Sequence, residues 1–472
     1  MLRDPLSDAV QRDPSATALE AEGRVWSYGE LDERVRAFAT QLGEAGAQRG
    51  DRIAMLLPVG PESVVAAHAA WRSGAVLVPM HDAWPGPEIA RCLAALPTNI
   101  IVAIPGDDRI AGTASLLPAV DRPARALPTV GPRSVSPDDP CTIIWTSGTT
   151  GRPRGVELTW GNMWASATAI ASRLGLRPTD RWYAALPVAH IGGLALVFRA
   201  ASVGASVMVE GFDAGSLARS IDAGRISHAS LVPTMLQRLL DARADRPVPD
   251  SLRLLLVGGA ETPRPLLERA IAGGYPIATT YGLTECTSQV ATATPDLVRR
   301  KPGTVGPPLD GVEIRIGDDG AIAVSGPTLM RRYVGGTAIP RDGWFATADL
   351  GRVDADGDLW ITGRRDARII TGGVTVDPAE IEQALLRYPG LRDACVVGVE
   401  DPEWGESVAA AVVFQPGITL DTDDVAAHCR TTLAAAKCPR RWVVTDVIPR
   451  NANGKVERNT VAAWFSGPRN VA

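Results

Sequence analysis

Short, uninterrupted apolar runs recur along the first part of the chain, and they constrain the fold more than any other feature. Segments 52–57, 75–79 and 99–103 are largely apolar and are separated by stretches with helical spacing. A strand buried on both faces has no polar side, so such runs are typical of parallel sheets covered by helices. The pattern continues at 182–186, 206–209, 229–232, 252–257 and 276–280. The sequence therefore predicts an α/β fold with parallel-rich sheets, in which ligands bind at the carboxyl ends of strands.

The sequence predicts a helix before these apolar runs and β-hairpins after them. Ser27 and Glu30 have the spacing of a capping box and lead into apolar residues at three- and four-residue steps, which predicts a surface helix. After about Gly303 the chain changes to short strands with Asp/Gly turns at 317–320 and 354–357. These turns indicate antiparallel hairpins and hence a β-rich subdomain.

The last part of the chain has a pattern of its own. Beyond a Gly-Gly turn at 372–373, the sequence predicts a helix at 378–387 and strands near 394–399 and 408–414. This segment is long enough for a small separate domain. We therefore predict a large domain over 1–365 and a small α+β domain over 366–472.

Composition limits the partners of the chain. With 472 residues, 45% of them hydrophobic, it can bury a large core. A net charge of -5, spread without blocks, gives no basic field, so no nucleic-acid partner is expected. No segment reaches the roughly 18 apolar residues of a membrane span, and residues 1–20 lack a leader pattern. These features predict a cytoplasmic protein without membrane insertion, and they leave open whether two copies form a homodimer.

The spacing of cysteines and histidines gives no metal pattern. Six cysteines are dispersed without any Cys-x-x-Cys pair, and the five histidines show no paired ligand spacing. Both observations argue against a zinc site, and the cysteines also argue against a disulfide framework. We expect no structural transition metal and expect most cysteines to be buried.

Lysine is rare in this chain. There are three lysines against 45 arginines, and one of them, Lys455, follows Asn453 and Gly454 near the end. A compact ammonium group and a flat guanidinium fork do different chemistry, so a lysine kept in an arginine-rich chain suggests a role that arginine cannot fill. The plainer interpretation is a solvated surface group, which describes lone lysines in most proteins. Lys455 is our first candidate for a catalytic residue.

A loop rich in threonine, serine and glycine occupies residues 146–155. The run from Thr142 to Trp145 is predicted to be a strand that leads directly into it. Such a loop offers consecutive backbone N–H groups and hydroxyls to phosphate oxygens. It does not match a Walker A sequence, and by itself it could equally be a flexible connection.

Six segments in order resemble the ANL superfamily of adenylate-forming enzymes, which includes the acyl- and aryl-CoA ligases, and the resemblance covers nearly the whole chain. They are 146–155, Gly258 to Glu261, Tyr281 to Glu285, Gly343 to Asp349, Gly363 to Asp366, and Pro449 to Lys455. The resemblance implies an acid–thiol ligase with a large AMP- and acid-binding domain and a small mobile C-terminal domain. It also implies that ATP, Mg2+ and coenzyme A are used to make an acyl-adenylate and then an acyl-CoA.

The resemblance implies functional roles for several residues that local sequence alone would assign to structural roles. It makes Glu285 a catalytic Mg2+ ligand, although a Thr-Glu pair more often caps a helix. It makes Asp349 the acceptor for both ribose hydroxyls, although an aspartate between a strand and a turn is commonly a turn residue. The implied ATP-binding set is Thr146, Ser147, Gly148, Thr149, Thr150, Gly151, Arg154, Gly258, Gly259, Ala260, Thr280, Tyr281, Gly282, Thr284, Asp349 and Arg364.

The resemblance implies a hinge residue and a catalytic residue in the small domain. Asp366 matches the superfamily's hinge, where a few residues absorb the rotation between two half-reactions. Lys455 then enters the site to bridge the acyl carboxylate and the α-phosphate, where negative charge builds up. Arg154 departs from the pattern because many relatives carry a lysine there; arginine still binds phosphate, so we expect that function to be kept. The segment 372–378 also departs from the commoner form, which affects details of the thiol tunnel.

Three further segments are similar to the o-succinylbenzoate-CoA ligases of menaquinone biosynthesis: 186–193, 228–240 and 284–289. That acid carries two carboxylates, and the aromatic one needs a polar partner to offset its desolvation. The resemblance makes Arg238 and Ser288 candidates for binding the acid, and His190 a catalytic gate or polar contact. Arg238 could equally cover apolar surface with its stem. The alternatives are a ligase for another aryl or medium-chain acid, a stand-alone adenylation enzyme that loads a carrier protein, and a catalytically silent homologue.

Overall fold

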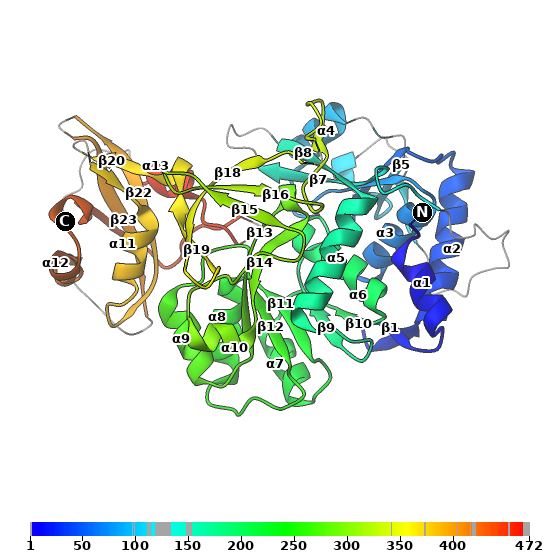
Figure 1. Ribbon diagram of the computed structural model, residues 1–472, viewed down its shortest axis with the longest axis horizontal. Coiled ribbons are helices and arrows are strands. Elements are labelled where there is room, and N and C mark those ends of the chain that lie inside the picture. Colours follow the sequence, from blue (N-terminus) through cyan, green and yellow to red (C-terminus); the bar gives the residue numbers. More distant parts are fainter. Residues whose placement is uncertain are drawn as a thin grey trace.

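The computed structural model describes residues 2–96, 98, 100–110, 115–118, 134–147, 153–340, 342–371, 374–402, 404–415, 417, 422–451 and 454–465. They form a large body and a smaller C-terminal body, which lies at the left of Figure 1. The Gly-Gly turn predicted at 372–373 lies outside these residues.

The first sheet of the large body has seven strands, in the order β17-β8-β7-β4-β3-β5-β6. Its parallel centre confirms the first three predicted strands and includes the strand before the loop at 146–155, because β3 pairs with β4 and β5, and β4 pairs with β7. The strand β8 returns antiparallel to β7 and closes a hairpin around that loop. The bounds are β3 (Arg52–Leu56), β4 (Val76–Pro79), β5 (Ile100–Ala103), β6 (Ser115–Leu116), β7 (Pro140–Ser147), β8 (Pro153–Thr159) and β17 (Arg332–Tyr333).

The second sheet has eight strands, in the order β14-β13-β12-β11-β9-β10-β1-β2. The five remaining predicted strands are β9 to β13, and they pair in parallel with one another. The two edge strands, β14 and β2, pair antiparallel with their neighbours. The bounds are β1 (Thr17–Ala21), β2 (Arg24–Ser27), β9 (Arg181–Ala184), β10 (Ser206–Val209), β11 (His228–Leu231), β12 (Leu254–Val257), β13 (Ile277–Leu283) and β14 (Ser288–Ala293).

Helices cover these sheets, and the main core lies among α3, α5 and α6. Trp71, Trp160 and Phe198 are fully buried there, with the Trp71 and Phe198 rings packed edge to face 5.3 Å apart. The capping box predicted at Ser27 and Glu30 is present at the start of α2. The bounds are α1 (Pro5–Arg12), α2 (Tyr28–Glu44), α3 (Pro61–Arg72), α4 (Gly86–Ala95), α5 (Trp160–Leu174), α6 (Ile191–Val203), α7 (Ala214–Asp222), α8 (Pro233–Arg243), α9 (Arg264–Ala272) and α10 (Pro295–Arg300), with the 3-10 turns η1 (Asp108–Ile110) and η2 (Thr284–Cys286).

A four-stranded antiparallel sheet forms the predicted β-rich subdomain, in the order β15-β16-β18-β19. Its strands are β15 (Glu313–Ile316), β16 (Ala321–Ser325), β18 (Phe345–Val353) and β19 (Leu359–Arg364). The turns at 317–320 and 354–357 join antiparallel pairs, as predicted. The placement of Asp349 between a strand and a turn is wrong, because Asp349 lies inside β18. A strand that carries polar side chains does not look like an apolar run, so the sequence pattern did not show that β18 continues through Asp349.

The C-terminal body is built on a five-stranded sheet in which β22 and β23 form a long hairpin and β24 adds in parallel. The sheet is buried on both faces, with Val396 and Ala410 on one side and Cys395 and Ala409 on the other. The predicted helix is α11. The bounds are η3 (Arg365–Ala367), β20 (Ile369–Thr371), β21 (Val374–Val376), α11 (Pro378–Leu385), β22 (Leu391–Asp401), β23 (Gly405–Phe414), α12 (Thr422–Thr432), η4 (Ala435–Lys437), β24 (Arg441–Val444) and α13 (Arg458–Ala463).

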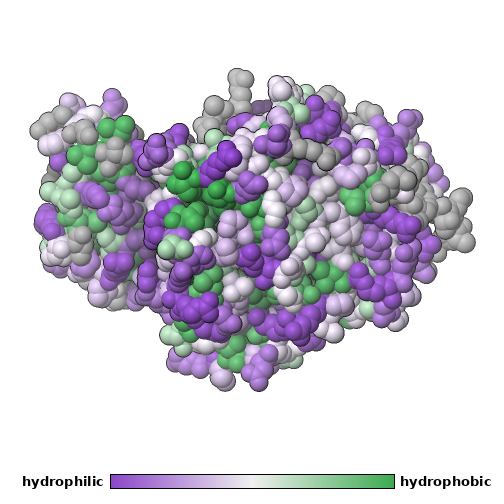
Figure 2. Space-filling model, viewed as in Figure 1, coloured by the Kyte–Doolittle hydropathy of each residue, from purple (hydrophilic) through white to green (hydrophobic). Residues whose placement is uncertain are grey.

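One face of the molecule is mostly hydrophilic (Figure 2), and most cysteines are buried, as the sequence predicts. Figure 2 shows a face that is mostly hydrophilic, with separate small hydrophobic patches. Among the described residues, no helix has both the length and the hydropathy needed to cross a membrane. All six cysteines are free, and five of them are buried while Cys438 is half-buried.

Candidate active site

Residues that follow strands of both large sheets come together, and a loop of the C-terminal body reaches them. His81 follows β4 of the first sheet, while His190 lies between β9 and α6 at the second, and their ring centroids are 5.0 Å apart. Gly454 lies against Val232, the residue after β11, since a Cβ added to Gly454 would be 3.2 Å from a Val232 methyl carbon. This is the edge of α/β sheets at which ligands bind.

Glu285 stands in η2, directly after β13. The hydroxyl of Tyr333 donates a hydrogen bond to Glu285 Oε1 over 2.7 Å. Burial and the Glu285 carboxylate raise the pKa of Tyr333, so the phenol remains a donor. The guanidinium carbon of Arg154 lies 3.4 Å from the centroid of the Tyr333 ring, a close cation–π contact. Because no described arginine, lysine or histidine forms an ion pair with Glu285, its charge is available to a bound cation.

Asp349 is held from two sides. Arg364, at the end of β19, lies opposite Asp349 in the antiparallel pair, and its Nη1 donates to Oδ1 over 2.8 Å. The hydroxyl of Tyr281 donates to Oδ2 over 2.7 Å. Burial and the carboxylate raise the pKa of Tyr281, which keeps its proton on the oxygen. Each carboxylate oxygen retains a further lone pair, so Asp349 can still accept hydrogen bonds from a pair of hydroxyls.

Three glycines of the predicted ATP-binding set have partly structural explanations. A Cβ on Gly258 would lie 2.6 Å from the methyl carbon of Thr280, and one on Gly282 would lie 1.8 Å from the carbonyl oxygen of Ser288. Internal packing therefore requires both glycines. Gly259 has φ +81°, a left-handed conformation that glycine adopts at no steric cost.

The two histidines of the site are neutral and incompletely hydrogen-bonded. His81 is buried and His190 is half-buried, and neither Nε2 atom has a hydrogen-bond partner among the described residues. Burial, His81 and the charge of Lys455 lower the pKa of His190 to about 3. Burial also lowers the pKa of His81. At neutral pH both rings are therefore uncharged hydrogen-bonding groups.

Lys455 differs from the other two lysines in its partners. Lys437 contacts both oxygens of Glu380 at 2.6 Å, and Lys301 is surrounded by three aspartates. Lys455 is exposed and forms no ion pair with any residue that the structure describes. The preceding residue, Gly454, lies against Val232, so the loop of Lys455 reaches the candidate site.

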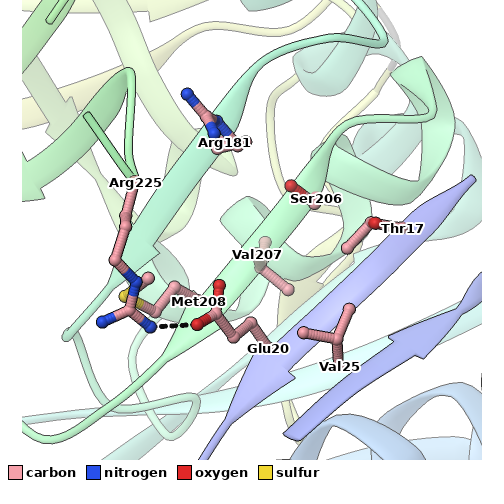
Figure 3. Close-up of a pocket in the computed structure, with 8 residues that line it drawn as sticks. All are labelled: Thr17, Glu20, Val25, Arg181, Ser206, Val207, Met208 and Arg225. Atoms are coloured by element: carbon pink, nitrogen blue, oxygen red, sulfur yellow. Dashed lines mark hydrogen bonds and ion pairs between the residues drawn. The ribbon is translucent and has the colours of Figure 1, made fainter. Parts of the chain in front are cut away.

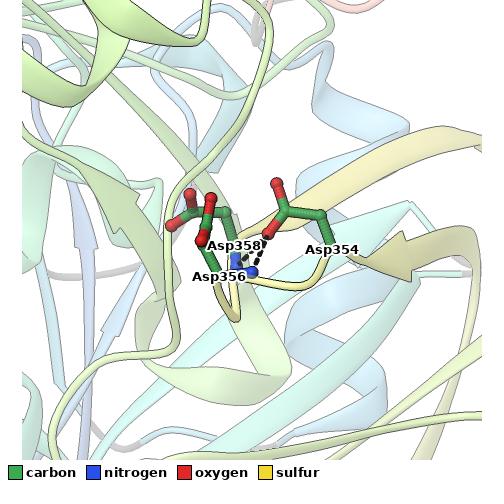
Figure 4. A group of neighbouring side chains, drawn as sticks. All are labelled: Asp354, Asp356 and Asp358. Atoms are coloured by element: carbon green, nitrogen blue, oxygen red, sulfur yellow. Dashed lines mark hydrogen bonds between the residues drawn. The ribbon is translucent and has the colours of Figure 1, made fainter.

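The three aspartates in the β18–β19 turn form a separate structural cluster. Asp354 Oδ1 accepts hydrogen bonds from the backbone N–H groups of Asp356 and Asp358, both over 3.0 Å, which closes the turn (Figure 4). Lys301 Nζ lies 3.0 Å from Asp354 and 2.6 Å from Asp358. The ammonium group of Lys301 therefore offsets part of the negative charge of the three carboxylates.

A cavity along β1 and β10 is also separate from the motif residues. Its volume is about 200 Å³, and Figure 3 shows Arg225 and Glu20 paired within it. This ion pair offsets the charges of Arg225 and Glu20, while the guanidinium of Arg181 donates to the carbonyl of Gly224. None of the predicted site residues lines the cavity. The lining consists of Thr17, Glu20, Val25, Arg181, Ser206, Val207, Met208 and Arg225.

The remaining predicted residues lie nearby, on the surface, or outside the described part. Thr146 donates from its hydroxyl to the carbonyl of Arg154, and Thr280 donates to the carbonyl of Ala291. Ala260 and Thr284 are half-buried beside the motif residues. Outside the described part are Gly148, Thr149, Thr150 and Gly151, together with the side chains of Ser147 and Asp366.

The two candidates for binding the acid are less well connected to the site. Arg238 is exposed on α8, one turn after Thr234, and its guanidinium forms no hydrogen bond with any described residue. Thr234 lies near Gly454, so this face of α8 borders the loop of Lys455. Ser288 begins β14 with φ +87° and pairs with Leu283. No contact joins Arg238 or Ser288 to His190 in the described residues.

Sequence reasoning missed two residues of the site, His81 and Tyr333. His81 follows a predicted buried strand at its carboxyl end, and that position alone could have marked it as a candidate. Tyr333 had no such signal, because it lies in the two-residue strand β17 far along the chain from Glu285.

Comparison with known proteins identifies the family of the chain. The model of the AMP-binding enzyme family matches residues 6–334, and that of the AMP-binding enzyme C-terminal domain matches residues 380–455. A 2-succinylbenzoate–CoA ligase of Bacillus cereus is 34% identical, and the match covers 94% of this chain and 95% of the relative.

Two solved structures of an o-succinylbenzoate coenzyme A synthetase from Bacillus subtilis are similar throughout. One was solved with the acyl-adenylate intermediate; it has a TM-score of 0.88, 32% identity and coverage of 99% of each chain. The other was solved with ATP and a magnesium ion; it has a TM-score of 0.86, 32% identity and coverage of 97% of this chain and 99% of the relative.

Proposed function

The chain belongs to the family of AMP-binding enzymes, and from this we propose that it is an ATP-dependent ligase that joins o-succinylbenzoate to coenzyme A. In the first half-reaction a carboxylate oxygen of the acid bonds to the α-phosphorus of ATP, and the bond to pyrophosphate breaks. In the second, the sulfur of coenzyme A loses its proton and bonds to the acyl carbon, and AMP leaves with the electron pair of the broken bond. The product is an intermediate of menaquinone biosynthesis.

The placement of Lys455 is the observation that carries this proposal. Its ammonium group has no carboxylate partner among the described residues, and the preceding Gly454 lies against Val232 at the sheet edge that also carries His190. Adenylation brings two anions together, the acid carboxylate and the α-phosphate. A fixed positive charge between them stabilises the transition state by an amount on the order of 3 kcal/mol. The neutral ring of His190 can add a hydrogen bond without repelling the ammonium group.

The nucleotide fits two other groups of the candidate site, Asp349 and Arg154. Asp349 is oriented by Tyr281 and Arg364, and its remaining lone pairs suit the two ribose hydroxyls. The guanidinium of Arg154 is held by the Tyr333 ring and can bind phosphate oxygens bidentately.

Glu285 fits the role of a magnesium ligand. Its carboxylate is half-buried, keeps one oxygen on Tyr333, and has no basic partner among the described residues. Mg2+ prefers hard oxygen ligands and takes few of them from the protein, so one carboxylate together with substrate phosphates suffices. When bound, the ion would neutralise phosphate charge as pyrophosphate departs.

The two half-reactions require a change in the C-terminal body. We propose that residues 366–472 rotate as a unit about Asp366 against the domain 1–365. The amide of Gln383 on α11 donates to Glu261 over 2.8 Å, so this contact between the bodies would break as Lys455 withdraws. The space vacated by the Lys455 loop would then admit the thiol. We also propose that the reaction takes place in the cytoplasm, where ATP and coenzyme A are available.

Pyrophosphate exchange with a panel of acids tests the proposal. We expect exchange with o-succinylbenzoate and much weaker exchange with benzoates and medium-chain acids. Exchange that favours simple benzoates would reject the assignment of the acid, and exchange with none of them would indicate a silent homologue. Replacing coenzyme A by a carrier protein with a pantetheine arm, in an assay of thioester formation, separates a CoA ligase from a carrier-loading enzyme.

A further inference from the structure

His81 is a buried imidazole whose position the proposed mechanism does not use. It follows β4, is 5% exposed, and its ring is tilted by 49° to the ring of His190. Its Nε2 atom is buried and has no hydrogen-bond partner among the described residues. Native proteins rarely leave such an atom unpaired, because its desolvation is not offset.

The surroundings of His81 decide which nitrogen carries the proton. The backbone N–H of Ala83 donates to Nδ1 over 3.0 Å, which requires a free lone pair on that nitrogen. Asp82 also lies near Nδ1, at 3.2 Å, but 37% of its side chain is exposed and water can solvate its charge. In the neutral ring the proton therefore resides on Nε2. His81 presents a buried N–H donor that has no acceptor.

The segment that carries His81 is held rigidly. Arg109 donates to the carbonyl oxygens of Asp82 and Trp84, and its other nitrogens bind Asp107. The Nε2–H group is therefore fixed before any ligand arrives, which lowers the entropic cost of binding to it.

The donor lies beside the reacting end of the proposed site. The ring of His81 lies beside the ring of His190, with centroids 5.0 Å apart, and the loop of Lys455 reaches the same sheet edge through the contact of Gly454 with Val232. An acid whose carboxylate meets Lys455 would place its next oxygen-bearing groups near the two rings.

We propose that His81 binds the acid substrate, donating a hydrogen bond from Nε2 to a keto or carboxylate oxygen of the acid, and so helps to determine which acids are accepted. The inference rests on the proposed function, because it takes the acid from there. In o-succinylbenzoate the acceptor is either the ketone that joins the succinyl chain to the ring or the ring carboxylate.

Two substitutions at this position separate hydrogen bonding from packing. The terminal amide of glutamine reaches the place of Nε2, whereas that of asparagine reaches only the place of Nδ1. We expect His81→Asn to raise the KM for o-succinylbenzoate by about three- to tenfold, the value of one neutral hydrogen bond, with the KM for ATP unchanged. His81→Gln should stay within about twofold of the wild type for both. Thermal unfolding of each variant checks that the fold is intact.

Two acid analogues identify the acceptor, one with the ketone replaced by a methylene group and one without the ring carboxylate. The effect of His81→Asn should vanish with the analogue that lacks the acceptor and persist with the other. Isothermal titration of the acid in the presence of a non-hydrolysable ATP analogue should show the same difference in Kd.

Three outcomes would overturn the inference. The first is an unchanged KM for the acid in His81→Asn while the wild type exchanges pyrophosphate with o-succinylbenzoate, and this would leave the proposed function standing. The second is a fall in kcat that is equal for all acids, which would make His81 only a support for His190. The third is failure of His81→Gln to restore the KM. By contrast, absence of exchange in the wild type would reject the proposed function itself.

Discussion

The hydrogen bond from Tyr281 to Asp349 leads to a quantitative prediction for ATP binding. In the wild type, the 2.7 Å bond fixes one carboxylate oxygen and Arg364 fixes the other. Tyr281→Phe removes only the hydroxyl, so Asp349 must be oriented when the ribose binds. Fixing one side chain costs about 0.5–1.5 kcal/mol. Because Arg364 still holds Oδ1, we expect the KM for ATP to rise about three- to tenfold, with the KM for the acid unchanged.

Pyrophosphate exchange at saturating acid and varied ATP measures this effect. The matched control is Tyr275→Phe, because the Tyr275 hydroxyl is buried and has no hydrogen-bond partner among the described residues. ATP analogues that lack one ribose hydroxyl extend the test. If Asp349 binds the ribose, the loss of ATP binding energy for Tyr281→Phe tested with the analogue should be smaller than the sum of the two losses measured separately. Equal changes in the KM values for ATP and acid, or strictly additive penalties, would refute the assignment of Asp349.

Three more predictions concern other parts of the molecule. Lys455→Ala should lower the rate of adenylate formation by about 10²- to 10³-fold and spare thioester formation from preformed adenylate. The control Lys437→Ala should change neither rate. An equal loss of both rates in Lys455→Ala would contradict the proposed role of Lys455. Burial lowers the pKa of His68 to about 4, so the unfolded chain takes up this proton below pH 6.5 and the folded chain does not. The free energy of unfolding should therefore fall by about 2 kcal/mol between pH 7 and pH 5, and urea titrations should show a smaller fall for His68→Gln. Arg238→Ala should raise the KM for the acid more than that for ATP, and an unchanged acid dependence in exchange assays would remove Arg238 from the site.

The strands of the parallel sheets could be predicted because their burial is visible in the sequence. Segment 75–79 is apolar throughout and became β4, which is buried along its length. By contrast β18 carries Thr347 and Asp349 toward hydrogen-bonding partners, and its polar residues hid its extent. Strands that build a site give a weaker signal than strands that build a core, since their side chains are chosen for contacts other than packing.

The site was predictable where residues follow one another in a motif, and less so where the fold brings them together. Glu285 and Lys455 were found through their neighbours in sequence. Tyr333 reaches Glu285 through tertiary contacts, the pairing of β17 with β8 and the hydrogen bond from the Met330 N–H to the Glu285 carbonyl. His81 meets His190 only because two sheets share one core. Such contacts between distant segments depend on tertiary packing, which no local pattern specifies.

Two of the three lysines contact carboxylates and Lys455 contacts none among the described residues, and this difference has a practical consequence. Carboxylates contact the amines of Lys301 and Lys437 and shield them from electrophiles. Apart from the amino terminus, an amine-directed fluorescent reagent would therefore mark mainly position 455. A dye there would sit on the C-terminal body, so the native sequence already provides an attachment point for testing, in single molecules, the proposed rotation of that body.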